Sequence, residues 1–523
     1  MAETVIQLAE ALKKGLRNRE QDKKGLDNLV TCTFLKPGDF GLEPFVTPTQ
    51  PVSGAELTAN SITVGTSGPQ YFKGKSRSFV LEATKLWELD EDAGTLTQIT
   101  TYDFVDQVST KSIPSGELWQ ASDNNDFWCF WNGQCLLTLK PYSTGERAFV
   151  NDTNTINTGC LWKGRTFFGG FDPSDYYSTQ WETEWESKYS QLIAWDSRFG
   201  LGGPAENWVW WSSIGGGDTF LSQGGALDVT SSSDGISGLP SGTQVEDDEL
   251  YTFYSLRNEA GFMPMPWQGK PTTIKPLGRY VIVYGENGVS ALNPIVNPVP
   301  TMGLIPDVLN IGVPFRGLVC GNEQMHYFVT NQGVLYKINA ELQVERLGYE
   351  EFLLPMVGSY DKQQMAFDPN RGDVFISDSS FAYMYNPAFG LAKAPFALLS
   401  GVQAEGAFLA FTHSTDSGNP SVVSKDITVG RNQLTTLRRV DVVLSHGASD
   451  VDITLKIESK DTVDTATYRV EYNGALSEFA YNTNWITASH FKITLTPDRQ
   501  DCIIEDVVLT FDDEGKKDLR KLF

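Results

Sequence analysis

Apolar positions near the N-terminus recur with the period of an α-helix. Val5, Leu8, Leu12 and Leu16 lie three or four residues apart, and the segment that follows them is rich in Lys and Arg. This spacing predicts a short amphipathic helix within residues 1–30. Two interpretations of its apolar stripe stay open: the stripe packs on its own domain, or it is a docking arm that contacts a neighbouring subunit.

From residue 31 to about 400, short apolar runs alternate with tight turns. Hairpins are predicted around residues 127–139, 279–293, 326–339 and 373–386, several of them at Asn-Gly turns, which match the twist of paired strands. The last three turns are spaced by about 45 residues, the length of one four-stranded propeller blade. The pattern therefore predicts an irregular β-propeller. A long β-sandwich and a β-solenoid are the alternatives.

One period of this pattern can be divided into its four strands. Residues 316–320, 325–330, 334–338 and 343–347 each carry a β-type run, and turn residues separate them. Blades of this kind bury their faces on their neighbours and close into a ring.

Residues from about 171 to 250 interrupt the period. This segment contains Trp181, Trp185 and Trp208, and it continues into a stretch rich in Gly and Ser. It is predicted to be part of a blade with an insertion. Its tryptophans are either core residues or insertion aromatics that contact a sugar or a partner surface.

The C-terminal region alternates between apolar and polar residues. The alternation is clear in segments 440–444, 451–457, 467–472 and 491–495, and a further β-type run spans 503–511. It predicts an antiparallel β-sandwich followed by a polar tail. The expected fold is all-β, with three domains: an N-terminal helix (1–30), an irregular β-propeller with an insertion (31–400) and a C-terminal sandwich (401–523).

The net charge of the chain argues against one class of function, binding to the outside of DNA. The chain carries 65 acidic and 41 basic side chains, a net charge of −24. A protein that grips the outside of DNA needs an excess of Lys and Arg. No apolar run has the length of a signal peptide core or a transmembrane helix, so stable membrane insertion is not expected.

The six cysteines are scattered and form no CxxC pair. In a two-residue hairpin at 127–139, Cys129 would face Leu136 and not Cys135, so no disulfide is expected there. Free thiols in a chain that folds in a cytoplasm are the preferred interpretation.

Candidate chemistry is sparse. The four histidines are dispersed, and neither a nucleophile elbow nor a phosphate-binding loop occurs. Acidic turns at 90–92, 123–126 and 512–514 were considered for calcium, but none matches a full calcium loop. The carboxylates at 182, 184 and 186, beside Trp181 and Trp185, are the most suggestive group for a glycosidase, which needs two carboxylates across a cleft. We expect no enzymatic activity, no cofactor and no metal.

One segment carries a resemblance to a known family. Residues 116–123 (GELWQASD), followed by Phe127-Trp128 and Asn132-Gly133, resemble a stretch of virion proteins in short-tailed bacteriophages, although Ser122 separates an Ala and an Asp that are adjacent there. Together with the plan of the whole chain, this resembles the tail nozzle, or hub, proteins of podoviruses.

The resemblance implies a homo-oligomeric, hexameric ring in the virion tail, assembled in the host cytoplasm. Its partners would be the tail adaptor or portal-side ring and the tail fibres or spikes. Genomic DNA would pass through the lumen during genome ejection without specific binding. No active-site residue is implied. The alternatives are a receptor- or glycan-binding β-propeller protein of a virion or cell surface, and a carbohydrate-active enzyme.

The acidity suits a conduit. Asp and Glu on the inner wall of such a ring would repel DNA and leave it free to slide, over a range of about 10 Å at ordinary salt. The alternative is that the acids are spread over the outer surface and keep the protein soluble.

Overall fold

The chain separates into two compact units. The sandwich unit comprises residues 1–49, 368–398 and 412–523, and the propeller unit comprises residues 50–367 and 399–411. The computed structural model describes residues 3–16, 29–39, 41–65, 68–82, 85–99, 119–123, 128–132, 136–142, 145–151, 157–170, 206–211, 261–295, 301–357, 364–378, 380–404, 407–414, 418–429, 433–446, 450–459, 462–471 and 477–518.

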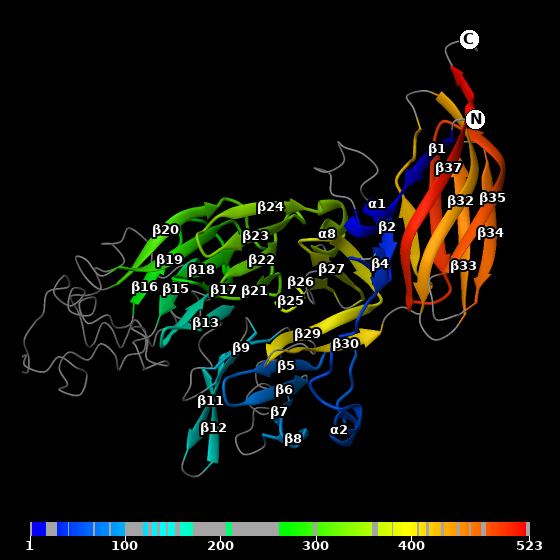
Figure 1. The fold of residues 1–523 in the computed structure, drawn as a ribbon. Coiled ribbons are helices and arrows are strands. Elements are labelled where there is room, and N and C mark those ends of the chain that lie inside the picture. The colour runs from blue at the N-terminus through cyan, green and yellow to red at the C-terminus, as the bar shows by residue number, and fades with distance from the viewer. Residues whose placement is uncertain are drawn as a thin grey trace, which may run out of the picture. The chain divides into compact units, whose positions relative to one another are not determined.

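Five four-stranded antiparallel sheets make up most of the described part of the propeller unit (Figure 1). In each sheet, every strand pairs with the next strand along the chain, which is the pattern of a propeller blade. The strands are β5 (Gln70–Lys73), β6 (Ser78–Glu82), β7 (Lys85–Asp90) and β8 (Thr95–Gln98); β9 (Gln120–Asp123), β10 (Trp128–Trp131), β11 (Leu136–Tyr142) and β12 (Gly145–Asn151); β13 (Thr158–Trp162), β14 (Arg165–Gly169), β15 (Trp208–Trp211) and β16 (Gly261–Pro264); β17 (Pro271–Leu277), β18 (Tyr280–Gly285), β19 (Val289–Ile295) and β20 (Thr301–Leu309); and β21 (Val319–Gly321), β22 (Met325–Val329), β23 (Leu335–Asn339) and β24 (Val344–Gly348).

Four further elements of this unit lie in the described residues. They are α2 (Gly54–Ala59), α8 (Glu350–Val357), most of β25 (Gln364–Asp368), and residues 399–404 and 407–411 of the hairpin β29 (Phe396–Ala404)–β30 (Ala407–Ser414). Ser53 caps α2 by accepting a hydrogen bond from the backbone N–H of Glu56 over 3.2 Å.

Apolar cores lie between neighbouring sheets. Strand β6 is buried on both faces along most of its length, because each blade of a propeller packs on two others. One core joins β5–β8 to β9–β12 and includes Phe79, Trp119 and Phe130. A second joins β13–β16 to β17–β20, and a third joins β5–β8 to β29–β30. The third core brings the first and last strands of the unit together, so the sheets close into a ring, and the predicted propeller is confirmed.

The predicted hairpins are confirmed as β10–β11, β18–β19, β22–β23 and β26–β27, and the segment 316–347 forms the four strands β21–β24. One detail was wrong. The loop between β10 and β11 has four residues and not two, so Cys129 pairs with Thr138 instead of Leu136.

The sandwich unit has two sheets. One has the order β3-β4-β37-β32-β35, with β1 also on β37, and the other contains β26-β27-β28-β2-β31-β36-β33-β34. The predicted C-terminal sandwich is confirmed. The strands are β1 (Glu3–Gln7), β2 (Leu29–Thr33), β3 (Leu35–Gly38), β4 (Gly41–Pro44), β26 (Asp373–Ser377), β27 (Ala382–Asn386), β28 (Gly390–Ala394), β31 (Ser421–Ser424), β32 (Gln433–His446), β33 (Val451–Ser459), β34 (Val463–Val470), β35 (Ser477–Ala488), β36 (Phe491–Pro497) and β37 (Cys502–Asp518).

The N-terminal segment differs from the predicted helix. Residues 3–7 form β1, which pairs with β37, and the helix α1 is confined to Ala9–Lys14. Leu8, Leu12 and Leu16 are buried within the sandwich unit, whereas Val5 is 54% exposed. The three leucines therefore pack on their own unit, as the first of the two interpretations expects, and Val5 does not. The strands β2–β4 also belong to this unit, although the sequence pattern predicts most of them to lie in the propeller (31–400).

The predicted insertion contains a strand of a blade. Trp208 opens β15 and is only 5% exposed, so it is a core residue and not a surface aromatic. Trp181 and Trp185 lie outside the described residues, as does the rest of the segment 171–250 apart from residues 206–211.

Candidate functional site: the central cavity of the propeller unit

A cavity of about 570 Å³ lies where the first strands of the sheets converge. Residues of β5, β9, β13, β17, β21, β25 and β29 line it. This arrangement follows from the propeller, in which the first strand of each blade lies nearest the axis. The volume falls in the range of about 300–1,000 Å³ that small-molecule sites occupy.

Hydrogen bonds and ring contacts hold the neighbouring sheets together around this cavity. The backbone N–H of Trp119 donates to Oε1 of Gln70 over 3.0 Å and joins β9 to β5. The rings of Trp131 and Phe168 meet edge to face at 5.8 Å and join the second sheet to the third. The backbone N–H of Ile274 donates to Oγ1 of Thr158 over 2.8 Å, which joins the fourth sheet to the third.

The strands β25 and β29 complete the lining. The backbone N–H of Met365 donates to the carbonyl of Gly317 over 2.8 Å, so β25 lies beside the start of the fifth sheet. The backbone N–H of Tyr71 donates to Oγ of Ser400 over 3.0 Å and connects β5 to β29. The chain thus returns to its first sheet, and strands from around the ring surround the cavity.

His326 is bound on both ring nitrogens beside the cavity. Nε2 lies 3.0 Å from the carbonyl of Pro276, and Nδ1 lies 2.9 Å from the hydroxyl of Tyr284. Its pKa is lowered to about 3, chiefly by burial and then by the charge of Lys275. The ring is therefore neutral at physiological pH, and its role is to join the fourth and fifth sheets.

Lys275 of β17 lines the cavity. Burial lowers the pKa of its amine, and the neighbouring thiols of Cys320 and Cys160 raise it in part. Burial raises the pKa of Cys320 to about 12 and the pKa of Cys160 further, so both thiols are neutral. No hydrogen bond or ion pair of Lys275 occurs within the described part of the chain.

Arg316 is the second cation of the lining and is 6% exposed. Its Nη1 lies 3.5 Å from Oδ1 of Asn157, and its guanidinium lies over the ring of Phe315 at 5.8 Å. Its backbone carbonyl accepts hydrogen bonds from Nε2 of Gln120 at 3.0 Å and Oγ1 of Thr273 at 2.8 Å.

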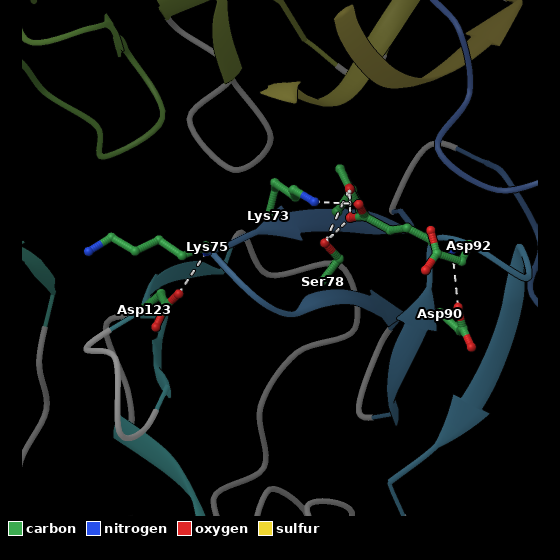
Figure 2. A network of polar contacts seen from close by, with 8 residues as sticks. Lys73, Lys75, Ser78, Asp90, Asp92 and Asp123 are labelled. Atoms are coloured by element: carbon green, nitrogen blue, oxygen red, sulfur yellow. Dashed lines mark hydrogen bonds and ion pairs between the residues drawn. The ribbon is translucent and has the colours of Figure 1, made fainter. Parts of the chain in front are cut away.

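A polar network covers one region of the first sheet (Figure 2). The carboxylate of Glu91 accepts hydrogen bonds from Lys73 and Ser78. These contacts lower the pKa of Glu91, although burial, the largest effect, opposes the shift. Figure 2 shows Lys73 and Ser78 directed into the network.

The acidic turn that was considered for calcium uses its carboxylates locally. Oδ1 of Asp90 accepts hydrogen bonds from the backbone N–H groups of Asp92, at 3.1 Å, and Ala93, at 3.0 Å (Figure 2). Oδ2 of Asp123, the first residue of the second candidate, accepts from the backbone N–H of Lys75 over 2.9 Å. In the residues that the structure describes, no three His, Cys, Asp or Glu side chains are grouped to hold a metal ion.

Sequence reasoning did not single out Lys275 or Arg316. Each is one basic residue in a β-rich stretch, and no motif surrounds it. The carboxylates at 182, 184 and 186 that were considered for a glycosidase lie outside the described residues. Of the helices in the described ranges, none is long and apolar enough to cross a membrane.

No family model and no curated protein matches the chain. Among solved structures, it is similar to the extracellular domain of a putative one-component system from B. thetaiotaomicron, at 8% identity and a TM-score of 0.36, over 91% of this chain and 64% of that one. PorZ, a surface component of the type IX secretion system of Porphyromonas gingivalis, is similar at 11% identity and a TM-score of 0.32, over 68% of this chain and 35% of PorZ.

A third similarity is to an exo-β-1,3-galactanase from Phanerochaete chrysosporium, at 9% identity and a TM-score of 0.24, over 88% of this chain and all of that one (100%). The chain spans less than two-thirds of the length of the first two proteins. With TM-scores this low, these similarities say nothing about the ligand, partner or activity of the chain.

Proposed function

We propose that this protein is a structural component of the tail of a short-tailed bacteriophage, where it forms a hexameric ring through which the genome leaves. The observation that carries the proposal is the structural role of the segment that resembles the phage proteins. Its described residues join the first two blades of the propeller and carry out no evident chemistry.

Two aromatic residues of this segment are packed in a core. Trp119 is 3% exposed and Trp128 is 4% exposed, and both belong to the apolar core between the first two sheets. The ring of Trp128 meets Phe79 edge to face at 5.0 Å. The segment holds two blades of the propeller together. Its resemblance to the phage segment therefore supports a shared propeller fold.

A polar residue of the segment also connects the two sheets. Asp123 accepts a hydrogen bond from the backbone of Lys75. Gln120 accepts one from Nε1 of Trp131 over 3.0 Å, within its own sheet. A Cβ on Gly74 would lie 2.2 Å from the Trp128 ring and 2.5 Å from the Asp123 carboxylate, so the glycine permits this close approach. The segment thus forms a continuous contact between β5–β8 and β9–β12.

The lumen of the proposed ring lies between subunits. The central cavity of one propeller has only about 570 Å³, the size of a small-molecule site and not of a channel for a DNA duplex. The charge of −24 on each subunit, repeated around a ring, provides the repulsive wall that a conduit needs.

Electron microscopy and native mass spectrometry of the purified protein test the proposal, alone and with the adaptor protein encoded in the same genome. We expect a ring of six copies with a central opening. A protein that stays monomeric under both conditions, and that is absent from purified virions, would overturn it.

A second candidate function, a receptor- or glycan-binding propeller, is favoured by the central cavity. Its lining includes the amide side chains of Gln70, Gln120 and Gln364, and amides are common partners of sugar hydroxyl groups. Binding of neutral sugars on a glycan array, lost when the cavity is altered, would support this function over the structural one.

A further inference from the structure

The central cavity brings together two cations of an acidic protein. The chain carries a net charge of −24, yet both Lys275 and Arg316 line the cavity. Two acidic residues also belong to the lining. Asp123 accepts a hydrogen bond from the backbone of Lys75, and Glu323 is exposed to solvent. The four formal charges cancel, so any preference of the cavity for an anion depends on the surroundings of Lys275.

In the part of the chain that the structure describes, the amine of Lys275 forms no ion pair. The thiols of Cys160 and Cys320 stay protonated, because burial raises the pKa of each. His326 is neutral, and both of its nitrogens are already bound to Pro276 and Tyr284. An ammonium group that loses hydration without gaining a partner is costly, and a negatively charged ligand would compensate for that loss.

The position of Lys275 suits a ligand. The residue follows Ile274, whose side chain packs in the core between the third and fourth sheets, and successive residues of a strand point to opposite faces. The side chain of Lys275 therefore points away from that core, and it lines the cavity. Gln120 and Gln364, from two other strands, contribute amide groups to the same cavity.

We propose that the central cavity binds a small organic oxyanion, a carboxylate or a phosphate ester of about the size of a monosaccharide, whose negative oxygens contact the amine of Lys275. This inference concerns one propeller and is independent of ring assembly. Lys is a compact point charge that pairs with carboxylate and phosphate oxygens, and the cavity volume suits a ligand of this size.

Three probes of similar size separate charge from shape. D-Glucuronate carries a carboxylate, D-glucose 6-phosphate carries a phosphate, and D-glucose carries no charge. Isothermal titration calorimetry on the full chain should detect at least one of the two anions, and glucose should bind about tenfold more weakly or not at all. Comparing the two anions shows which oxyanion is preferred.

Two variants locate the site. Lys275→Gln should weaken anion binding by about tenfold or more, because it removes the positive charge and keeps a polar side chain. Lys85→Gln is the matched control, since Lys85 is exposed on the outer strand β7, and it should bind like the wild type. Thermal unfolding of both variants checks that each is folded, and Lys275→Met replaces the glutamine variant if that one is not.

A second measurement observes Lys275 directly. Reductive methylation with ¹³C-formaldehyde labels the amines and preserves their charge, and the resonance lost in Lys275→Met identifies Lys275. The midpoint of its pH titration should lie below those of the exposed lysines. It should rise when the tighter-binding of the two sugar anions is added, because a bound anion favours the charged amine.

The proposal is overturned if neither anion binds, if glucose binds as tightly as the tighter-binding anion, or if Lys275→Gln binds like the wild type. It is also overturned if the tighter-binding anion leaves the titration midpoint of Lys275 unchanged. Ring assembly of Lys275→Gln should be normal, so a failure of this proposal is distinguishable from a failure of the structural function.

Discussion

Tyr284 and His326 form a hydrogen bond of 2.9 Å between two blades of the propeller. Its direction is fixed by the other side of the ring. Nε2 of His326 lies 3.0 Å from the carbonyl of Pro276, which can only accept, so Nε2 carries the proton and Nδ1 accepts from the Tyr284 hydroxyl. Protonation of Nδ1 would replace this acceptor with a donor, in a site where His326 is only 1% exposed.

We therefore expect the propeller unit to lose stability as the pH falls below 6.5. The pKa of His326 is lowered from 6.5 to about 3, so between these values the unfolded chain binds a proton that the folded chain does not. The free energy of unfolding should decrease by about 2 kcal/mol between pH 6.5 and 5, at about 1.4 kcal/mol per pH unit. Urea unfolding at a series of pH values measures this slope.

His326→Gln tests the origin of the slope. The amide can accept from Tyr284 and donate to Pro276 but cannot become charged, so the slope between pH 6.5 and 5 should flatten. His490→Gln is the control, because His490 is exposed and in the sandwich unit, and it should keep the wild-type slope. An unchanged slope in His326→Gln would show that another group causes the acid sensitivity.

The cores between blades should dominate the stability of the propeller unit. Phe79 is fully buried and contacts Trp128 and Phe130 edge to face. Phe79→Ala should lower the free energy of unfolding by about 3–5 kcal/mol, since it removes buried apolar atoms and leaves a cavity. Leu354→Ala, at a side chain that is 51% exposed, should change it by less than about 0.5 kcal/mol. Equal effects of the two changes would contradict the closed ring of packed sheets.

The N-terminal segment should stabilise the sandwich unit. Leu12 of α1 is 1% exposed, whereas Val5 of β1 is 54% exposed. Leu12→Ala should therefore lower the stability of the sandwich unit by about 2–5 kcal/mol, and Val5→Ser should have little effect on it. Denaturant unfolding, followed by hydrogen exchange in each unit, separates the two contributions. If Leu12→Ala leaves the fold intact and only prevents incorporation into particles, the docking-arm interpretation is correct.

The sequence predicted those parts of the fold that depend on neighbouring residues. Asn287-Gly288 is a local turn signal between two apolar runs, and the hairpin of β18 and β19 forms there. The alternation in β33 likewise reports one buried face, and its buried and half-buried residues alternate as expected. Such elements can be predicted from neighbouring residues alone.

The features that the sequence did not predict depend on distant partners. Val5 fits a helical stripe, but residues 3–7 pair with residues 508–512 of β37. They form a strand because of this pairing. Lys275 looks like any polar residue of a strand. It becomes a candidate ligand-binding residue only because seven strands, spread from residue 70 to residue 404, converge around it.

Lys275 should also make the stability of the propeller unit depend on alkaline pH. Burial lowers the pKa of its amine below the ordinary value of 10.5, so between these two values the unfolded chain binds a proton that the folded chain does not. The contribution of Lys275 to stability therefore rises with pH through that window. The buried thiols of Cys160 and Cys320 act in the opposite sense above about pH 9, because their pKa values are raised.

Lys275→Met isolates the contribution of the amine, since both chains keep the thiols. The variant should be more stable than the wild type at pH 7, by about 1 kcal/mol or more, because it removes a poorly compensated charge. This advantage should shrink as the pH rises toward 10.5, because the wild-type amine becomes neutral in the folded state. Urea unfolding of the two proteins from pH 7 to 10.5 measures the difference. An advantage that stays constant over this range would mean that Lys275 keeps its ordinary pKa, and a destabilised variant at pH 7 would mean that the amine already has a counter-charge.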